Sequence, residues 1–201
     1  MHGAGPDRRR RPAHYARPMP LPGPVHLARW IEENAEAFRP PVSNKVLTRD
    51  SEFITMVVRG PNRRNDFHIN PGDELFQQLR GAIEVDVREE DGSVTRHRVG
   101  EGELFLVPGG VPHSPRRPAG TWGLVIERER TRRERDVIAW FCPACGHELW
   151  SASFTLRDIE TQLSAILRDF AADTARHRCE RCGTVLPPAT EPPAVPAPTG
   201  S

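Results

Sequence analysis

Apolar residues recur at helical spacing in two stretches of the chain. The first is residues 25–38, VHLARWIEENAEAF, where large apolar side chains share one face and acidic side chains lie on the other. We expect this amphipathic helix to end at Arg39, because a proline disfavours helical backbone at the residue before it. The second stretch, residues 157–173, RDIETQLSAILRDFAAD, predicts another helix. The apolar face of the first helix consists of Leu27, Trp30, Ile31 and Phe38.

Between residues 46 and 130 the pattern is that of strands. Six short segments are β-rich or alternate between apolar and polar residues, and turns containing Gly, Pro or Asp-Gly separate them. The pair Asp91-Gly92 lies between two alternating segments and predicts a hairpin. Several strands without interleaved helices favour an all-β sandwich or barrel. The segments are EFITMVVRG, ELFQQLRG, AIEVDVREE, VTRHRVG, ELFLVPGG and WGLVIERER.

Both ends of the chain are rich in proline. Residues 1–24 contain RRRRP and PMPLPGP, and residues 187–201 read PPATEPPAVPAPTGS. Segments of this composition bury little apolar surface, so we expect two disordered tails. The arginines at positions 8–11 also fit a nucleic-acid or targeting patch, but a solvated tail is the better interpretation.

The charge balance gives no support for a nucleic-acid or membrane partner. The 201 residues include 28 Lys and Arg against 27 Asp and Glu, so the net charge is +1 and attracts no polyanion. No apolar run approaches the roughly 18–20 residues that span a bilayer. The N-terminus also lacks the apolar core of a signal peptide. We therefore expect a cytoplasmic protein.

Four cysteines form two CxxC pairs, and a glycine follows each pair directly. In a chain without an export signal this spacing favours a metal over disulfides. Four thiolates leave no open coordination position, so the site should be structural, and tetrahedral sulfur suits iron and zinc alike. Residues 141–186, with a strand at 148–156 and the helix at 157–173 between the pairs, predict a small α+β unit. The ligands would be Cys142, Cys145, Cys179 and Cys182.

Two further motifs contain a second set of metal ligands. Residues 66–81 read D-x-H-x5-E-x6-G, and residues 102–113 read G-x5-P-x-G-x2-H. They resemble the two half-motifs of a cupin barrel, with Asp66 where a further histidine is frequent. Two imidazoles and one carboxylate occupy one face of a metal and leave the opposite positions open, which suits non-haem Fe(II) that binds a substrate and O2 together. The ligands would be His68, Glu74 and His113.

A wider resemblance covers residues 25–186. The segments PPVSNKVL, VVRGPNRRNDFHINPGDELFQQLRG, FLVPGGVPHSPRRP, LVIERER and WFCPACGHELW…CERCG are similar to the bacterial, two-metal form of the 3-hydroxyanthranilate 3,4-dioxygenase family. The resemblance implies a mainly β cupin fold. Its double-stranded β-helix, or jelly-roll barrel, would occupy residues 25–140 after the N-terminal helix, followed by a rubredoxin-like four-cysteine unit at residues 141–186. It also implies a homodimer, with the four-cysteine unit near the interface.

The same resemblance implies roles for individual residues. Arg117 and Glu127 would hold the substrate, which Glu74 would also contact. Arg64 would line the same pocket and face O2 together with Asn44, so Arg64 and Glu127 would act in catalysis. An arginine fork pairs with a carboxylate through two hydrogen bonds, which favours a carboxylated substrate.

The implied reaction is the Fe(II)-dependent, extradiol-type cleavage of 3-hydroxyanthranilate by O2. The product would be 2-amino-3-carboxymuconate 6-semialdehyde, which places the enzyme in tryptophan (kynurenine) catabolism or in quinolinate and NAD synthesis. Phe67 and Gln77 stand where close relatives would have tyrosines, which leaves the polarity of the pocket wall open.

Three other hypotheses remain. One is a cupin dioxygenase for a related carboxylated aminophenol or catechol. Another is a non-catalytic cupin that binds an aromatic acid, against which the complete ligand set argues. A third is a zinc-ribbon interaction or nucleic-acid module, against which the near-zero net charge argues.

Overall fold

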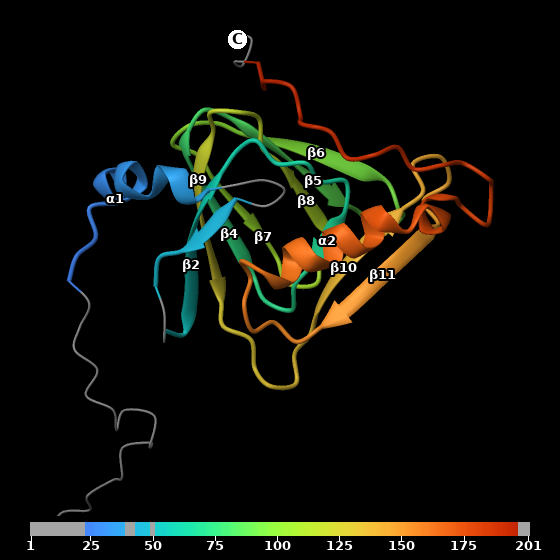
Figure 1. Cartoon of the computed structure of the whole chain (residues 1–201), viewed down its shortest axis with the longest axis horizontal. Coiled ribbons are helices and arrows are strands. Elements are labelled where there is room, and N and C mark those ends of the chain that lie inside the picture. Colours follow the sequence, from blue (N-terminus) through green and yellow to red (C-terminus); the bar gives the residue numbers. More distant parts are fainter. Residues whose placement is uncertain (1–22, 39–42, 49–50, 197–201) are drawn as a thin grey trace, which may run out of the picture. The chain divides into compact units, whose positions relative to one another are not determined.

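The computed structural model describes residues 23–38, 43–48 and 51–196 (Figure 1). The arginines at positions 8–11 and most of the predicted N-terminal tail lie outside these residues. Residues 187–196 contain no helix or strand. No helix in the described ranges is long and apolar enough to cross a membrane. The strands are β1 Asn44–Val46, β2 Phe53–Arg59, β3 Phe67–Ile69, β4 Glu74–Arg80, β5 Ile83–Arg88, β6 Val94–Val99, β7 Leu104–Val107, β8 His113–Arg116, β9 Trp122–Arg128, β10 Asp136–Phe141 and β11 Glu148–Phe154.

The strands form two antiparallel sheets in jelly-roll order. One sheet contains the series β2-β9-β4-β7, and the other contains β3-β8-β5-β6. From β2 to β9 every connection except the β5–β6 hairpin therefore crosses from one sheet to the other, as in the double Greek key of a jelly roll. Strand β1 extends the first sheet, and β10 and β11 extend the second. The predicted mainly β jelly-roll barrel is confirmed.

Strands β5 and β6 form the hairpin that Asp91-Gly92 predicts. They pair from Ile83 opposite Val99 to Arg88 opposite Val94. Gly92 has a φ of +84°, a left-handed conformation that glycine adopts without a Cβ clash. A turn set by neighbouring residues therefore determines the register of this pair.

Burial alternates along β4 and β9 and shows which side chains face the barrel interior. In β4 the buried residues are Glu74, Phe76 and Gln78, while their neighbours are partly exposed. In β9 the same alternation buries Val125 and Glu127. Because successive side chains point to opposite faces of a strand, acids and apolar side chains share one interior. The buried apolar cluster of the barrel consists of Ile54, Met56, Phe76, Ile83, Val85, Val87, Val99, Val107 and Val125.

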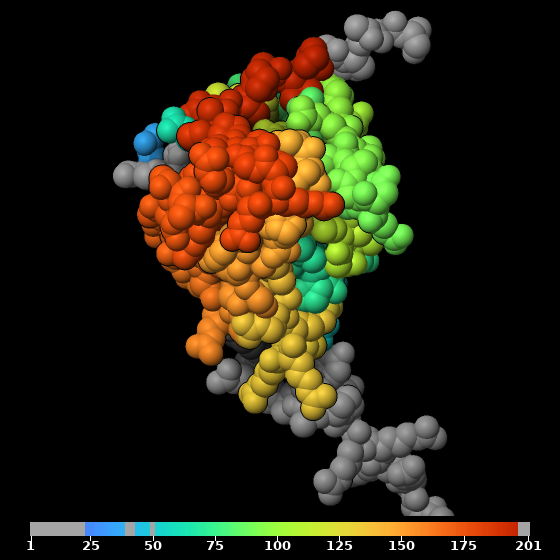
Figure 2. Space-filling view, turned by 90° about the vertical axis from the view of Figure 1, so that its right-hand side faces the viewer, coloured from blue at the N-terminus to red at the C-terminus, as the bar shows by residue number. Residues whose placement is uncertain are grey.

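Strand β10 connects the barrel to the four-cysteine unit, because it pairs with β3 on one side and with β11 on the other. Helix α2, Gln162–Ala172, packs on these two strands, and the Phe170 ring stacks on Trp140 with 3.9 Å between centroids. Figure 1 shows α2 in front of β10 and beside β11, and Figure 2 shows the orange and red C-terminal segment covering much of one face. The predicted boundary between residues 140 and 141 lies at the end of β10.

Both predicted helices form, but each is shorter than expected. Helix α1, Leu27–Asn34, is followed by a 3-10 turn at Ala35–Ala37. Phe38 does not continue the helical face. Its backbone is extended (φ −89°, ψ 110°), and its ring packs edge-on against Trp122 with 5.0 Å between centroids. Burial against a barrel strand therefore outweighs helical periodicity at this residue.

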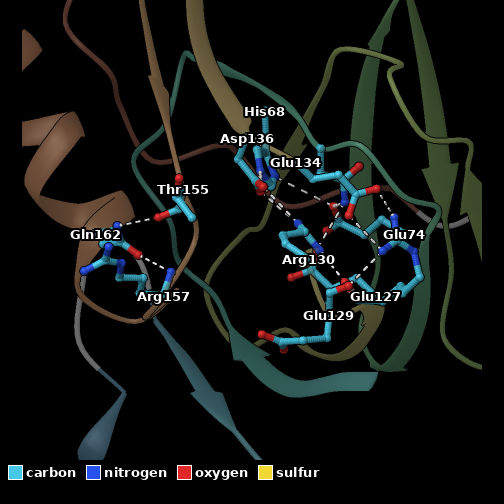
Figure 3. Close-up of polar contacts among 12 residues, drawn as sticks. His68, Glu74, Glu127, Glu129, Arg130, Glu134, Asp136, Thr155, Arg157 and Gln162 are labelled. Atoms are coloured by element: carbon cyan, nitrogen blue, oxygen red, sulfur yellow. Dashed lines mark hydrogen bonds and ion pairs between the residues drawn. The ribbon is translucent and has the colours of Figure 1, made fainter. Parts of the chain in front are cut away.

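Helix α2 begins at Gln162, five residues later than predicted. The reason is that the Gln162 side chain forms hydrogen bonds with backbone groups of the preceding residues (Figure 3). Its Oε1 accepts hydrogen bonds from the backbone nitrogens of Arg157 and Asp158, at 2.6 and 2.8 Å. Its Nε2 donates to the Thr155 carbonyl oxygen at 3.1 Å. These bonds hold residues 155–161 as a loop.

Candidate functional site

Three buried side chains from three strands converge inside the barrel. His68 is the middle residue of β3, Glu74 is the first residue of β4, and His113 is the first residue of β8. The two histidines are opposite each other in the β3–β8 pair. One possible ligand atom from each side chain lies within 4.8 Å of the others. The structure thus brings together the three residues that the two sequence motifs selected.

Each histidine is hydrogen-bonded through the ring nitrogen that faces away from this cluster. His113 Nδ1 lies 3.0 Å from the Val111 carbonyl oxygen, and its Nε2 lies 3.0 Å from Glu74 Oε2. His68 Nε2 lies 2.9 Å from Asp136 Oδ2, and its Nδ1 lies 3.8 Å from Glu74 Oε2. An acceptor on one ring nitrogen leaves the lone pair of the other for a metal. Two imidazoles and one carboxylate in this arrangement fit a facial metal site.

The cluster favours the charged form of its carboxylate. Burial alone raises the pKa of Glu74, but His113, His68 and Arg130 together lower it to about 2. Burial likewise lowers the pKa of His113, but the Glu74 carboxylate raises it above the ordinary value. A buried anion beside two imidazoles has the charge that a divalent cation requires.

A cavity opens beside the cluster, and the four-cysteine unit contributes part of its wall. Asn44, Arg64, His68, Glu74 and Arg117 line it on the polar side. A mostly apolar cavity with a few convergent polar groups is typical of a small-molecule site. The apolar lining consists of Met56, Val58, Phe76, Pro115, Val125 and Ile138 from the barrel, and of Phe154, Leu156, Ile159 and Leu163 from the four-cysteine unit.

The two buried arginines of the cavity differ in charge compensation. Arg64 donates to Asp66 through Nε at 3.0 Å and Nη2 at 2.6 Å. Burial alone lowers the pKa of Arg64, but Asp66 raises it above the ordinary value. Arg117 is 2% exposed, and within the described residues its guanidinium donates only to the Gln78 amide oxygen, at 3.4 Å. Burial lowers the pKa of Arg117 to about 10. Arg117 is therefore a buried cation that an anionic ligand would stabilise.

Glu127 points into the barrel beside Glu74, which is its neighbour in the β4–β9 pair. Glu127 Oε2 accepts hydrogen bonds from Asn70 Nδ2 at 3.0 Å and from Arg130 Nη2 at 2.8 Å. Oε1 is buried without a hydrogen-bond partner among the described residues. Burial and the neighbouring Glu74 charge raise the pKa of Glu127. Glu127 is not itself among the described residues that line the cavity, so its unpaired Oε1 lies outside the cavity wall.

Asn44, Phe67 and Gln77 lie in different surroundings. Asn44 lines the cavity, its Nδ2 lies 3.6 Å from Met56 Sδ, and its buried Oδ1 has no partner in the described part of the chain. Phe67 packs edge-on against Phe141, with 5.6 Å between centroids, and lines a separate surface groove. Gln77 is on the outer face of β4. Neither Phe67 nor Gln77 is among the described residues that line the cavity.

Sequence reasoning missed Arg130 and Asp136. Asp136 is fully buried and bonded to His68, and Arg130 donates to Asp136 through Nε and Nη2, both at 2.8 Å. Burial raises the pKa of Asp136, but Arg130 and His68 lower it to about 2. In the sequence both residues lie in the charged run ERERTRRERD, which is typical of a solvated loop. The one available signal is that Asp136 directly precedes an apolar strand.

The four cysteines lie in two turns of the same form. Gly146 N donates to the Cys142 carbonyl oxygen at 2.9 Å, and Gly183 N donates to the Cys179 carbonyl oxygen at 2.8 Å. Both glycines have positive φ, +68° and +76°, which explains the glycine after each CxxC pair. The four sulfur atoms lie within 4.8 Å of one another, as a tetrahedral site requires.

The thiols of this cluster differ in acidity. Hydrogen bonding to Thr184 lowers the pKa of Cys182 to about 6. A backbone hydrogen bond at His147 lowers the pKa of Cys145, but desolvation and the three other thiols raise it to about 12. A cation bound by all four sulfurs would lower the pKa of every thiol in the cluster, because it favours the thiolate form of each.

Comparison with known proteins identifies the family. The sequence profile "3-HAO: 3-hydroxyanthranilic acid dioxygenase" matches residues 19–171. A 3-hydroxyanthranilate 3,4-dioxygenase from Bacillus cereus (strain 03BB102) is 44% identical over 166 residues, which are 83% of this chain and 93% of that protein. Another from Xanthomonas campestris pv. campestris (strain 8004) is 43% identical over 164 residues, 82% of this chain and 92% of that protein. Among solved structures, a cupin-2 domain protein from Shewanella frigidimarina aligns with a TM-score of 0.41 and 18% identity, over 49% of this chain and 91% of that chain. The chain belongs to the 3-hydroxyanthranilic acid dioxygenase family.

Proposed function

We propose that the protein is an Fe(II)-dependent 3-hydroxyanthranilate 3,4-dioxygenase that forms 2-amino-3-carboxymuconate 6-semialdehyde. The observation that carries the proposal is one cavity lined both by His68 and Glu74, which cluster with His113, and by Arg117, a buried cation without a carboxylate partner in the described chain. The first feature suits a metal with open positions, and the second suits the substrate carboxylate. The named relatives support the same substrate.

The catalytic metal would be held by His68, Glu74 and His113. When bound, Fe(II) supplies open positions for substrate and O2, and the redox chemistry that allows O2 to react with an organic ring. The cavity wall then excludes water, because apolar side chains from the barrel and from the four-cysteine unit surround the ring of the substrate.

The remaining polar residues would orient the substrate and move protons. The Arg117 guanidinium would pair with the carboxylate through two hydrogen bonds. Glu127 Oε1 would accept a hydrogen bond from the amino or hydroxyl group, and its raised pKa suits a group that holds a proton. Arg64, held by Asp66, would face O2 together with Asn44.

We also assign a structural metal, iron or zinc, to Cys142, Cys145, Cys179 and Cys182. Four reduced cysteines in one metal-type cluster support a reducing, cytoplasmic location. A homodimer is supported by apolar side chains that lie exposed on the first sheet, namely Phe53 at 58%, Leu104 at 62% and Leu106 at 53%. Sedimentation of the purified chain tests the homodimer, and a monomer at micromolar concentration would contradict it.

The reaction is tested by adding Fe²⁺ and 3-hydroxyanthranilate to the reduced protein in air. We expect O2 uptake and the near-ultraviolet absorbance of the ring-opened product. Verified Fe²⁺ binding without product would overturn the proposal. A parallel assay with related carboxylated aminophenols and catechols decides substrate identity, because a higher kcat/KM for one of these would replace 3-hydroxyanthranilate as the substrate.

A further inference from the structure

The buried pair Arg130 and Asp136 lies next to His68 of the His68, Glu74 and His113 cluster (Figure 3). The side chains of Arg130 and Asp136 are 1% and 0% exposed. Asp136 accepts from Arg130 Nε at Oδ1 and from Arg130 Nη2 at Oδ2, both at 2.8 Å. Asp136 Oδ2 also lies 2.9 Å from His68 Nε2. The pair therefore contacts a proposed metal ligand without being one itself.

Arg130 connects two parts of the site. Its Nη2 donates to Asp136 and also to Glu127 Oε2, at 2.8 Å in each case. Its Nη1 donates to the Arg128 carbonyl oxygen at 2.7 Å. One guanidinium thus neutralises the carboxylate behind His68 and the carboxylate beside Glu74, and each hydrogen bond restricts its orientation.

Arg130 lies in the loop between β9 and β10, and Asp136 is the residue at which this loop enters β10. Arg128 and Glu134 pair across this loop, with Nη2 to Oε1 at 2.6 Å and Nη1 to Oε2 at 2.9 Å. Glu134 Oε2 also accepts from the Thr131 backbone nitrogen at 2.7 Å. These contacts hold the loop on its outer side, while Arg130 and Asp136 occupy its inner side.

We infer that Arg130 and Asp136 are positioning residues that set the tautomer and orientation of His68 and fix the orientation of Glu127 through its Oε2. The Asp136 carboxylate accepts a hydrogen bond from His68 Nε2–H, so the lone pair of Nδ1 faces Glu74 and His113. Arg130 keeps this carboxylate in place and orients Glu127 so that Oε1 stays free. The inference rests on the proposed metal site and is independent of the ring-cleaving reaction.

The first experiment measures the tautomer directly in the metal-free, full-length protein. Imidazole ¹⁵N–¹H spectra should show the His68 proton on Nε2. In Asp136→Asn the two Arg130 donors compete for the one remaining oxygen, so the amide NH₂ faces His68 and the proton moves to Nδ1. A His68 proton on Nδ1 in the wild-type protein would overturn the inference.

The second experiment measures the affinity of the full-length protein for Fe²⁺, anaerobically and against a chromogenic chelator. Asp136→Asn should weaken binding by roughly 10–100-fold, as the loss of an outer partner of a metal ligand does. The matched control is Asp86→Asn, because Asp86 is also a buried aspartate, 3% exposed, that pairs with arginines (Arg96 and Arg116). Asp86 has no contact with His68, so its variant should keep the wild-type affinity.

Equal affinities for Asp136→Asn and wild type, or equal losses for both aspartate variants, would contradict the positioning role. Should Asp136→Asn fail to fold, Arg130→Lys provides the same test. A lysine retains the charge but cannot contact both carboxylates, so the loss should fall toward the lower end of that range. A wild-type protein that binds Fe²⁺ through His68 without turnover would overturn the proposed function and leave this inference standing.

Discussion

The four-cysteine cluster and the His68, Glu74 and His113 cluster assemble in different ways. Each CxxC pair and its glycine form one local turn, so two short segments contain the whole cysteine site. The second cluster takes one residue from each of three strands, and its two histidines come together only when β3 pairs with β8. Four donors around an ion leave no open coordination position, whereas three donors on one side leave positions that face the cavity. The cysteine site, built from two local turns, therefore suits a structural role. The site built across three strands suits a catalytic role, because it leaves room for a substrate.

Replacing Glu74 should have the largest effect on the open site. Glu74→Ala removes the charged ligand and leaves two imidazoles, so we expect loss of both turnover and Fe²⁺, by more than the roughly 10–100-fold that loss of an outer partner causes. Neighbouring Asp73 is exposed, and within the described residues its side chain accepts a hydrogen bond from Gly109 N. Asp73→Asn is therefore the control, and similar losses in both variants would show that Glu74 is not a ligand.

Replacing a cysteine tests whether the closed site is structural. Cys145→Ser should lower the free energy of unfolding by at least about 3 kcal/mol, which lowers Tm by roughly 6–12 °C. Fe²⁺ at the His/Glu site and kcat per folded molecule should stay near the wild-type values. Differential scanning calorimetry and metal analysis measure the two quantities. Loss of turnover in a variant that keeps its fold and its His/Glu iron would contradict the division between the sites.

The two buried arginines should respond in opposite ways to replacement by methionine. Arg64→Met leaves Asp66 buried without its partner, so unfolding should require about 3–5 kcal/mol less. Arg117→Met removes an uncompensated buried cation, so stability should be unchanged or higher, while KM rises roughly 10–100-fold through loss of charge-assisted hydrogen bonds. Urea unfolding and steady-state kinetics measure both. A destabilised Arg117→Met with unchanged KM would assign this residue to folding.

The smallest expected effect distinguishes the two cysteine turns. Gly183→Ala meets open space, so only the left-handed backbone opposes it, at about 1 kcal/mol. At Gly146 an added Cβ would lie 3.2 Å from an Arg88 side-chain nitrogen that donates to the Gly146 carbonyl oxygen at 2.9 Å. Gly146→Ala should therefore cost more. Equal unfolding free energies for the two variants would mean that Arg88 moves freely.

Local sequence patterns predicted those helices, strands and turns whose conformation depends on a few consecutive residues. The Asp91-Gly92 hairpin, both helices and most of the barrel strands appear where their patterns place them. The exceptions are short or atypical strands. β3 has three residues, and β8 contains a proline and reads HSPR, so both resemble loops until their partners are known. Their pairing places the two histidines together.

Electrostatic compensation could not be predicted from the sequence. Asp66 lies two residues before His68 and pairs with Arg64, whereas Arg117 has no such partner within the described chain. The charged run ERERTRRERD, which ends at Asp136, contains three buried residues, Glu127, Arg130 and Asp136, and several exposed ones, and residue type does not separate the two groups. Which charge is buried depends on packing across the barrel, because burial raises the cost of an unpaired charge by several kcal/mol.

The sequence by itself determined the jelly-roll class, the two cysteine turns and the three residues of the cupin half-motifs that cluster in the barrel. In each case the cause lies in a few consecutive residues, such as alternation along a strand or a glycine with positive φ. Only the tertiary structure decided that Glu127 points inward, that Phe154 and Leu156 help to wall the cavity, and that Asp136 backs His68. These features could not be predicted, because the burial and the hydrogen bonds of these residues depend on segments that are distant in the sequence and adjacent only in the folded protein.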